Sequence, residues 1–179
     1  MVKKKQRAIF LDRDGVLNKP IICKRKSFAP RKFKDFVIYP NVAKYCKLLK
    51  KIFLLIVVTN QPDIKRKLIS LKEINLMHKK LYNLTKYDNL YYSIALNKNS
   101  FMRKPNPGML IKAIKDFNIN PKKSYMIGDR WSDIKAGNKV GCKTIFIDRN
   151  YNEKKPSLQD YNVSSFSSAA RIILNDKNR

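Results

Sequence analysis

Acidic residues are scarce in this chain of 179 residues: 13 Asp and Glu stand against 40 Lys and Arg, a formal net charge of +27. Histidine occurs once, at position 78, and the three cysteines, at positions 23, 46 and 142, lie far apart. Structural zinc sites are built from closely spaced Cys and His pairs, so no zinc site is expected. An odd number of scattered cysteines also argues against a disulfide scaffold, and we expect a cytoplasmic protein.

Long apolar runs are also missing. The longest uninterrupted run covers residues 52–58, and because a membrane span needs about 20 apolar residues, none is expected. The basic start at Lys3 is followed by an apolar stretch that Asp12 interrupts, which does not fit a secretory signal peptide. The hydrophobic content of 44% nevertheless suffices for a core. We expect a single domain, residues 1–179, with a core at about 7–148 and a C-terminal extension at 149–179.

The large positive charge has two explanations. A pI near 10.2 is typical of proteins that bind nucleic acids, because Lys and Arg neutralise phosphates and release counterions. The lysines are, however, spread along the whole chain together with many Asn and Ile residues, and the codons of all three are AT-rich. Genome composition alone can therefore produce the charge. Because no basic stripe with interleaved aromatic residues is evident, a nucleic-acid partner is not expected.

Apolar segments alternate between the strand period and the helix period. This alternation predicts parallel strands joined by right-handed helical crossovers, and hence an α/β fold: a three-layer sandwich with a central parallel, Rossmann-like sheet. Residues 18–35 are basic and have little periodicity, so they are expected to form a small flap insert, and no large cap domain is expected. The predicted strands are 7–11, 53–58, 90–95, 124–127 and 144–147, and the predicted helices are 41–51, 71–85, 107–117, 132–139 and 166–174.

The helix at 71–85 has the clearest boundaries. Ser70 and Glu73 form a capping-box signature at its start, in which the serine side chain accepts a backbone hydrogen bond and the glutamate returns one. Apolar residues recur at helical spacing, which predicts one face packed on the core. That face is expected to consist of Leu71, Ile74, Met77, Leu81 and Leu84.

Acidic residues follow two of the predicted strands, at the sheet edge where α/β proteins bind ligands. Asp12 and Asp14 lie two apart on an extended segment and so point the same way, and neighbouring carboxylates favour a bound cation or a shared proton. A solvated turn is the alternative, because Asp-Gly is a common turn pair. Asp129 follows another strand, and Asp133 lies near the next helix start, where it can equally serve the helix dipole.

Two further polar clusters occupy equivalent positions. Thr59 and Asn60 end the strand at 53–58 and offer a hydroxyl and backbone N–H groups of the kind that hold phosphate. Arg103 and Lys104 precede a helix start, where anions are favoured. Taken singly, the first is an ordinary polar strand terminus and the second is unremarkable in so basic a chain. The order of the four clusters decides their interpretation.

Asp-x-Asp-Gly, Thr-Asn, Lys-Pro and Gly-Asp-x-x-x-Asp follow one another between positions 12 and 133. This order resembles the haloacid dehalogenase (HAD)-like phosphohydrolases, and all four family motifs are present. FLDRDGVLN, TNQ, RKPNPGM and GDR more closely resemble the branch that contains heptose-bisphosphate and histidinol phosphatases. Two departures stand out: the zinc-binding Cys and His pairs of many members are absent from 91–102, and Pro-Asp-Ile-Lys at 62–65 replaces a segment of small residues.

The resemblance implies a two-step mechanism. Asp12 would be the nucleophile that forms an aspartyl-phosphate, and Asp14 would act first as general acid and then as general base. Mg²⁺, without zinc, would be held by the Asp12 carboxylate, the Asp14 backbone carbonyl and Asp129. The transferred phosphoryl group would be held by Thr59, the N–H of Asn60 and Lys104.

The remaining positions concern the substrate. Arg103 is expected to bind a second substrate phosphate, because its planar fork suits bidentate contacts, Asn18 is expected to touch the sugar, and Asp133 to orient Lys104 or a metal-bound water. Arg13 and Trp131 receive no role. The implied function is a monomeric Mg²⁺-dependent phosphatase that removes the 7-phosphate of heptose 1,7-bisphosphate. The alternatives are a histidinol-phosphate phosphatase, a polynucleotide 3′-phosphatase, and a non-enzymatic basic interaction protein on a phosphatase fold.

Overall fold

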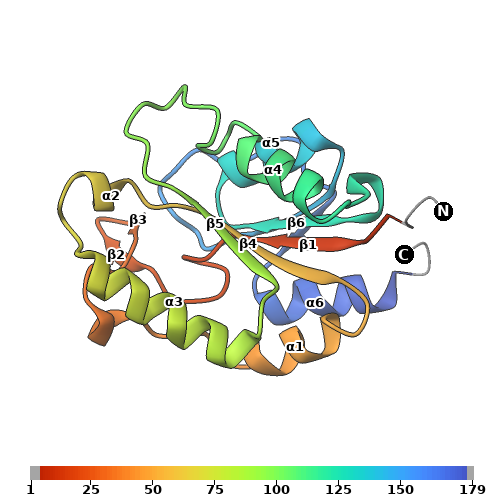
Figure 1. The fold of residues 1–179 in the computed structure, drawn as a ribbon, viewed down its shortest axis with the longest axis horizontal. Coiled ribbons are helices and arrows are strands. Elements are labelled where there is room, and N and C mark those ends of the chain that lie inside the picture. The colour runs from red at the N-terminus through yellow and green to blue at the C-terminus, as the bar shows by residue number, and fades with distance from the viewer. Residues whose placement is uncertain (1–4, 177–179) are drawn as a thin grey trace.

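The computed structural model describes residues 5–176, and at its centre lies a sheet of six parallel strands (Figure 1). The strand that comes first in the chain does not lie at an edge of the sheet but between two later strands. All neighbouring pairs are parallel, as the alternation of strands and helices predicted. In spatial order the strands are β5 (Asn89–Ser93), β4 (Leu54–Asn60), β1 (Ala8–Leu11), β6 (Tyr125–Gly128), β7 (Lys143–Ile147) and β8 (Tyr161–Val163).

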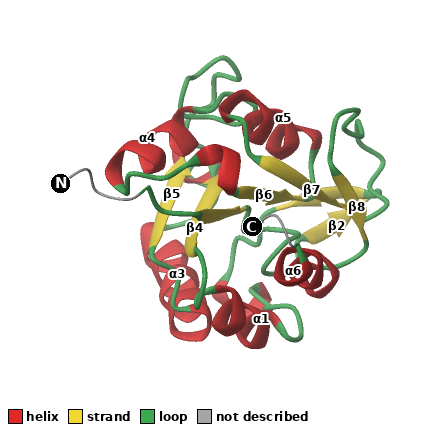
Figure 2. Ribbon diagram, turned by 90° about the vertical axis from the view of Figure 1, so that its right-hand side faces the viewer, coloured by secondary structure: helices red, strands yellow, loops and turns green. Residues whose placement is uncertain are grey.

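Helices cover both faces of the sheet, which confirms the predicted three-layer sandwich. Figure 2 shows α4 and α5 on one face and α1, α3 and α6 on the other. Among the described residues, no helix combines the length and apolar character that crossing a membrane requires. The helices are α1 (Val42–Leu49), α2 (Pro62–Lys65), α3 (Leu71–Thr85), α4 (Gly108–Asp116), α5 (Trp131–Val140) and α6 (Phe166–Asn175), with 3-10 turns at Phe33–Asp35 and Pro121–Lys123.

Strand β1 shows how the sequence builds the two cores. Its residues alternate between the faces of the sheet, because successive side chains in a strand point in opposite directions. Ile9 and Leu11 pack into the hydrophobic cluster that contains the buried residues of α1, α3 and α6. Ala8 and Phe10 pack into the cluster under α4 and α5. A strand buried on both faces must be apolar throughout, which is why it reads as a continuous hydrophobic run.

Helix α3 differs in part from its predicted form. The three central apolar positions are buried, but Leu71 is 62% exposed and Leu84 is 43% exposed, so the prediction for these two was wrong. Thr85 is buried instead, and its hydroxyl donates to the backbone of the preceding turn. Ser70 accepts the expected bond from the N–H of Glu73 at 3.2 Å. The Glu73 carboxylate, however, accepts from the N–H of Phe33 and so fastens the helix to the insert.

A hairpin in the insert, strand β8 and the short helix α2 were not predicted. The insert at 18–35 contains an exposed hairpin, β2 (Ile21–Cys23) and β3 (Lys26–Phe28). Its turn residues, Lys24 and Arg25, both have positive φ values, which Asn or Gly would normally supply. Strand β8 has three residues and is too short to show a period, yet it pairs with β7 and completes the sheet.

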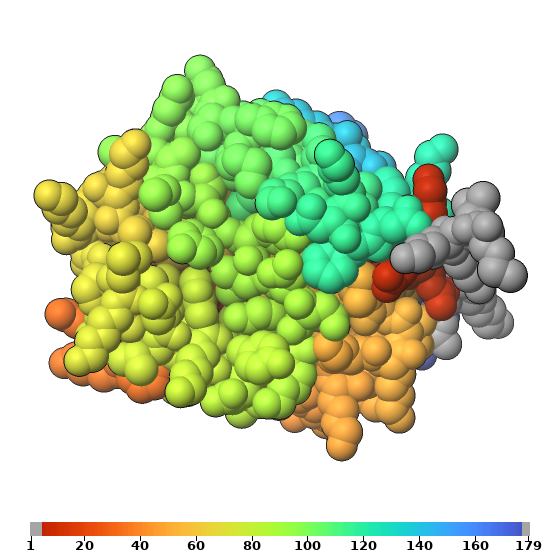
Figure 3. Space-filling model, viewed as in Figure 1, coloured from red at the N-terminus to blue at the C-terminus, as the bar shows by residue number. Residues whose placement is uncertain are grey.

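The four polar clusters of the sequence motifs lie at one edge of the sheet. Because the strands are parallel, the residues that follow β1, β4 and β6 emerge at the same edge of the sheet. In Figure 1 this edge is the side that carries α2 and the hairpin, whereas both termini lie at the opposite side. Figure 3 shows the segments around 65 (yellow) and 100 (green) projecting at the left and top of the same view.

Candidate active site

Three buried aspartates form the floor of the site. Asp12 directly follows β1 and Asp129 directly follows β6, and these strands are neighbours in the sheet. Asp133 comes from the first turn of α5. Each residue offers an oxygen that lies within 4.8 Å of the others, and all three are at most 7% exposed. Such a cluster is unstable without positive charge, because like charges repel strongly in a buried setting.

Two motif glycines allow this close approach. Gly15 has a φ of +89°, and a Cβ there would lie 1.8 Å from Oδ2 of Asp129. A Cβ on Gly128 would lie 2.1 Å from the Cβ of Asp133. Any side chain at either position would push a carboxylate out of the cluster, and this explains why both positions are glycine.

Lys104 supplies a positive charge to the floor. Its Nζ lies 2.9 Å from Oδ1 of Asp12 and 2.6 Å from Oδ1 of Asp133, and it donates to the backbone carbonyl of Val58 at 2.7 Å. The Asn60 side chain makes two hydrogen bonds with the backbone of Lys104. Its amide donates to the Lys104 carbonyl at 3.0 Å, and its Oδ1 accepts from the Lys104 N–H at 3.1 Å. Asn60 therefore positions Lys104 through its side chain, a role that the motif pattern did not predict.

The charges of this group are strongly perturbed. Burial, opposed by Lys104 and reinforced by Asp133 and Asp14, raises the pKa of Asp12 to about 6. Burial and the neighbouring carboxylates Asp12 and Asp133 raise the pKa of Asp129 well above its usual range. The pKa of Lys104 is raised, because Asp12 and Asp133 outweigh the effect of its burial. The lysine is thus fixed as a cation, while Asp12 and Asp129 ionise less readily than free aspartates.

Asp14 is held by five hydrogen bonds on its carboxylate. Arg13 donates three of them, from Nε to Oδ1 at 3.2 Å and from Nη2 to Oδ1 and Oδ2 at 3.1 and 2.9 Å. Asn18 donates to Oδ1 at 2.9 Å, and Gln61 donates to Oδ2 at 2.8 Å. Burial alone would raise the pKa of Asp14, but the Arg13 charge and these donors outweigh it and lower the pKa. Asp14 is therefore an ionised carboxylate in this state.

Asn18, which we expected to touch the sugar, lies beside Asp14. It is fully buried, and its amide donates to Asp14 and to the carbonyl of Lys19. It is not among the residues that line the pocket above the floor. In the structure it belongs to the groups that hold Asp14, and its contact with the sugar stays a prediction.

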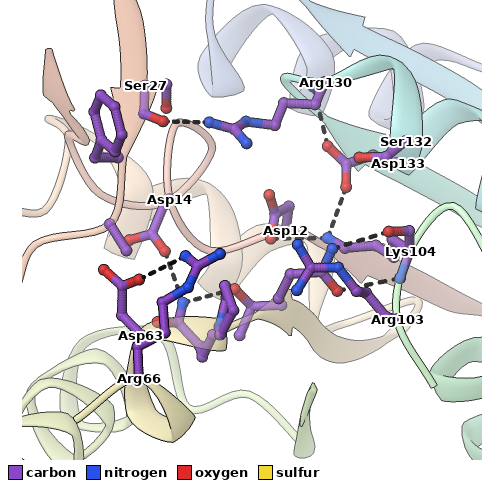
Figure 4. Close-up of a pocket in the computed structure, with 16 residues that line it drawn as sticks. Asp12, Asp14, Ser27, Asp63, Arg66, Arg103, Lys104, Arg130, Ser132 and Asp133 are labelled. Atoms are coloured by element: carbon purple, nitrogen blue, oxygen red, sulfur yellow. Dashed lines mark hydrogen bonds and ion pairs between the residues drawn. The ribbon is translucent and has the colours of Figure 1, made fainter. Parts of the chain in front are cut away.

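A pocket of about 240 Å³ opens above the floor (Figure 4). Asp12, Asp14, Thr59 and Lys104 line it from below. Three arginines, Arg66 after α2, Arg103 and Arg130, line its walls. Hairpin strand β3 closes one side, where Arg130 donates to the carbonyl of Ser27.

Comparisons with known proteins agree with this geometry. A family model described as HAD-hydrolase-like matches residues 101–167. D-glycero-beta-D-manno-heptose-1,7-bisphosphate 7-phosphatase of Haemophilus ducreyi is 33% identical and aligns over 80% of this chain and 84% of its own length. The corresponding alpha-anomer enzyme of Campylobacter jejuni is 34% identical, over 84% of this chain and 86% of its own. The chain belongs to the heptose-bisphosphate phosphatase branch of the HAD-like hydrolases.

A solved structure with the same fold comes from this branch. D,D-heptose 1,7-bisphosphate phosphatase from B. bronchiseptica, complexed with magnesium and phosphate, superposes with a TM-score of 0.78 at 20% identity, covering 95% of this chain and 99% of its own. The two relatives at one-third identity confirm the family resemblance drawn from the four motifs, and the solved structure confirms the fold class.

The residues of this branch member suit a divalent cation. Neither buried oxygen of Asp129 makes a well-formed hydrogen bond among the described residues, and the Tyr151 hydroxyl lies close enough to lower the pKa of Asp129 against the larger effect of burial. Both oxygens of Asp133 are engaged, one by Lys104 at 2.6 Å and the other by the N–H of Arg130 at 3.0 Å. Asp12 and Asp129 are therefore the carboxylates with capacity for a metal, and hard oxygen ligands are what Mg²⁺ prefers.

Sequence reasoning missed three residues of the site. Gln61 donates to Asp14 and also to Thr59 Oγ1 at 3.0 Å, and its place directly after Thr-Asn was the available signal. Arg66 and Arg130 also reach the pocket walls. Arg130 stands in the GDR motif, which was its available signal, whereas the position of Arg66 in a chain with 40 Lys and Arg carried none. Arg66, Arg103 and Arg130 line the same pocket, and burial together with the charges of Arg66 and Arg130 lowers the pKa of Arg103.

Proposed function

We propose that this chain is a Mg²⁺-dependent phosphatase that removes the 7-phosphate of D-glycero-D-manno-heptose 1,7-bisphosphate. The observation that carries the proposal is the shared pocket, which has a carboxylate–lysine floor and three arginines on its walls. A substrate with one reacting phosphate and a second anionic group matches this distribution of charge. The names of the two relatives at one-third identity supply the sugar.

In the first step, an oxygen of Asp12 attacks phosphorus and the bond from phosphorus to the sugar oxygen breaks. The leaving alkoxide takes a proton from the carboxyl group of Asp14, and an aspartyl-phosphate remains on Asp12. Asp14 is ionised before substrate arrives, so the proton that it passes on must enter with the substrate, as on a phosphate monoanion. The ionised form is ready for the second step.

In the second step, water transfers a proton to Asp14 and attacks the phosphorus of the aspartyl-phosphate. The bond to Asp12 breaks, and inorganic phosphate leaves with the carboxylate of Asp12 restored. Lys104, 2.9 Å from Asp12 Oδ1, lies where it can offset charge on the transferred oxygens, and the Thr59 hydroxyl faces the same space. Fixed donors of this kind are the main source of transition-state stabilisation in phosphoryl transfer.

The Asp12 and Asp129 carboxylates are the groups proposed to hold Mg²⁺, together with the backbone carbonyl of Asp14. Asp129 lies against Gly15, the residue that follows this carbonyl. When bound, the ion would neutralise the carboxylate cluster and the phosphoryl oxygens, which lets two negative groups approach each other. Asp133 is proposed to act on Lys104, to which it is paired.

The second phosphate of the substrate is assigned to the arginine wall. Arg103 donates from Nη1 to the carbonyl of Ala95 at 2.5 Å, so one edge of its guanidinium is anchored. Arg66 is paired with Asp63 and Arg130 with Glu153, which leaves Arg103 as the arginine without a carboxylate partner among the described residues. We therefore expect Arg103→Ala to raise KM for a bisphosphate far more than for a monophosphate.

The proposal is tested by measuring phosphate release from both anomers of heptose 1,7-bisphosphate, from histidinol phosphate and from 3′-phosphorylated DNA, each with Mg²⁺. We expect kcat/KM for one heptose anomer to exceed the others by at least about a hundredfold, with the 1-phosphate retained in the product. Asp12→Asn should lower kcat by at least about a thousandfold while the protein stays folded, since a covalent nucleophile is lost. Faster turnover of histidinol phosphate or of DNA would replace the sugar assignment.

We also propose that the enzyme works as a monomer in a reducing compartment. The described residues of one chain supply both the carboxylate–lysine floor and the arginine walls of the pocket, and this supports the proposed monomer. Cys23, Cys46 and Cys142 are all free thiols, which suits the cytoplasm. Sedimentation at the working concentration tests the first point.

A further inference from the structure

Arg13, the residue between the two motif aspartates, is completely buried. Three of its hydrogen bonds go to Asp14, all from the edge formed by Nε and Nη2. The guanidinium also lies over the ring of Phe36, 5.4 Å from its centroid. This arrangement uses one edge and one face of the group and leaves Nη1 to be satisfied by another part of the chain.

That partner is His78, the one histidine of the chain. It comes from the middle of α3, 65 residues away in sequence, and its Nε2 lies 3.2 Å from Nη1 of Arg13. An arginine has only donors, so a hydrogen bond at this distance requires an unprotonated Nε2. Burial, followed by the charge of Arg13, lowers the pKa of His78 to about 4, which agrees with a neutral ring whose proton is on Nδ1.

His78 does not touch the pocket itself. It is absent from the residues that line it, and its ring instead packs against Tyr92, with centroids 5.7 Å apart. Among the described residues, its hydrogen bond with the site is the one to Arg13, so we expect its effect on the reaction to pass through that side chain. A buried arginine with an unsatisfied N–H would turn toward another acceptor, because leaving a buried donor unpaired is costly.

We propose that His78 is a positioning residue that holds the Arg13 guanidinium, and through it the Asp14 carboxylate, in the orientation that proton transfer requires. The inference rests on the proposed role of Asp14 as acid and base. With Nη1 anchored on α3, the opposite edge of Arg13 faces Asp14 and contacts both of its oxygens. Loss of the anchor lets Arg13 tilt, and Asp14 then loses the bond that it accepts on each oxygen from Nη2.

The experiment uses three variants in the full chain. His78→Leu removes the acceptor and keeps an apolar side chain of similar size, whereas His78→Gln restores an acceptor on a longer arm. Met77→Leu is the matched control, because Met77 is the buried neighbour on the same helix and its volume is conserved. His78→Asn, whose amide stops short of Arg13, replaces His78→Leu if that protein does not fold.

The rates are measured on dinitrophenyl, nitrophenyl and phenyl phosphate, whose leaving groups need increasing help from a proton donor. We expect His78→Leu to lower kcat on phenyl phosphate at least tenfold and on dinitrophenyl phosphate less than twofold, with KM nearly unchanged. His78→Gln should recover most of the loss, and Met77→Leu should match the wild type. A purely structural role would lower all three rates in parallel, and that result would overturn the proposal.

A crystal structure of the His78→Leu protein gives a second test that needs no turnover. We expect its Asp14 carboxylate to leave the position described above, and an unchanged Asp14 would also overturn the proposal. These outcomes are separate from the sugar assignment. If the wild type hydrolyses the aryl phosphates but not heptose bisphosphate, the proposed substrate is refuted. The role of His78 is then still tested by comparing the variants on the three aryl phosphates.

Discussion

Lys104 and Asp133 form an ion pair of 2.6 Å in which each side chain is only 1% exposed. The same ammonium group lies 2.9 Å from Asp12, so one cation serves two buried carboxylates. Breaking a buried pair by removing one partner leaves a charge that is neither solvated nor compensated. The stability of the floor therefore depends on Lys104 as much as the proposed chemistry does.

Lys104→Met should abolish phosphatase activity and lower the free energy of unfolding by about 3–5 kcal/mol, because Asp12 and Asp133 then stay buried without a counter-charge. Urea denaturation in EDTA measures the effect. The control is Lys112→Met, which removes an exposed lysine paired with Asp116 and should change stability by less than about 1 kcal/mol. Equal effects of the two substitutions would contradict this account of the floor.

The contribution of Asp12 to the stability of the metal-free protein should become more favourable as the pH falls from 7 to about 4, whereas His78, whose pKa is lowered to about 4, opposes it in wild type and variant alike. The folded-state pKa of Asp12, about 6, lies above its unfolded value of 3.8, so the stabilisation is complete below the lower value and is lost as the pH rises through 6. Urea denaturation of wild type and Asp12→Asn across this range isolates the contribution, because asparagine does not titrate. The wild type should gain up to about 3 kcal/mol relative to the variant at low pH. A gain toward high pH would refute the assignment.

Asp129→Asn should separate metal binding from folding. The substitution removes one of three crowded carboxylates, so the melting temperature of the metal-free protein should rise. Mg²⁺ should stabilise the wild type by about 2.7 kcal/mol when its concentration is a hundred times the dissociation constant, and it should have little effect on the variant. Calorimetry with and without Mg²⁺ provides the comparison, and equal stabilisation of both proteins would exclude Asp129 as a ligand.

Zinc should be present at well below one atom per chain. The segment from Tyr91 to Met102, where related phosphatases carry their zinc ligands, has no Cys or His. Hydrogen bonds hold this loop instead, including two from the Asn106 amide to the carbonyls of Asn99 and Ser100. Elemental analysis of protein purified without chelator checks this. EDTA should stop catalysis, and Mg²⁺ alone should restore it. One tightly held zinc per chain would show that the ligand argument is wrong.

The net charge of +27 should give weak, salt-sensitive binding to DNA. Non-specific complexes have dissociation constants of about 10⁻⁴–10⁻⁶ M at physiological salt and weaken steeply as salt increases. Turnover of a small bisphosphate should depend on salt much less, because the pocket is partly shielded. Parallel salt titrations of DNA binding and of kcat/KM test this pair of expectations. Submicromolar DNA affinity at 150 mM salt would show that the charge has a nucleic-acid partner.

The positions of the motif aspartates could be predicted from the sequence because they depend only on the order and direction of the strands. Once β1, β4 and β6 are recognised as parallel, the residues after Leu11, Val58 and Gly128 must emerge at one edge. Contacts that cross between distant segments had no comparable rule. The pairing of Arg13 with His78, for example, depends on where α3 lies above the insert and not on any local period.

The errors have equally local causes. Leu84 and Thr85 are adjacent, and a helix advances about 100° per residue, so a small error in the direction of the core exchanges one for the other. The hairpin turn uses Lys24 and Arg25 at positive φ, where turn rules look for Asn or Gly. Strand β8, Tyr161–Val163, contains too few residues for alternation to be counted.

The single imidazole of this chain also gives the enzyme a built-in spectroscopic reporter. In a proton NMR spectrum, the ring signals of His78 need no assignment by mutation, because no other histidine contributes to that region. Its Nε2 contacts Arg13, which in turn contacts Asp14. Any ligand that alters the hold of Arg13 on Asp14 should therefore shift these resonances. Occupancy of the pocket can then be followed in an unlabelled sample, with no substrate consumed.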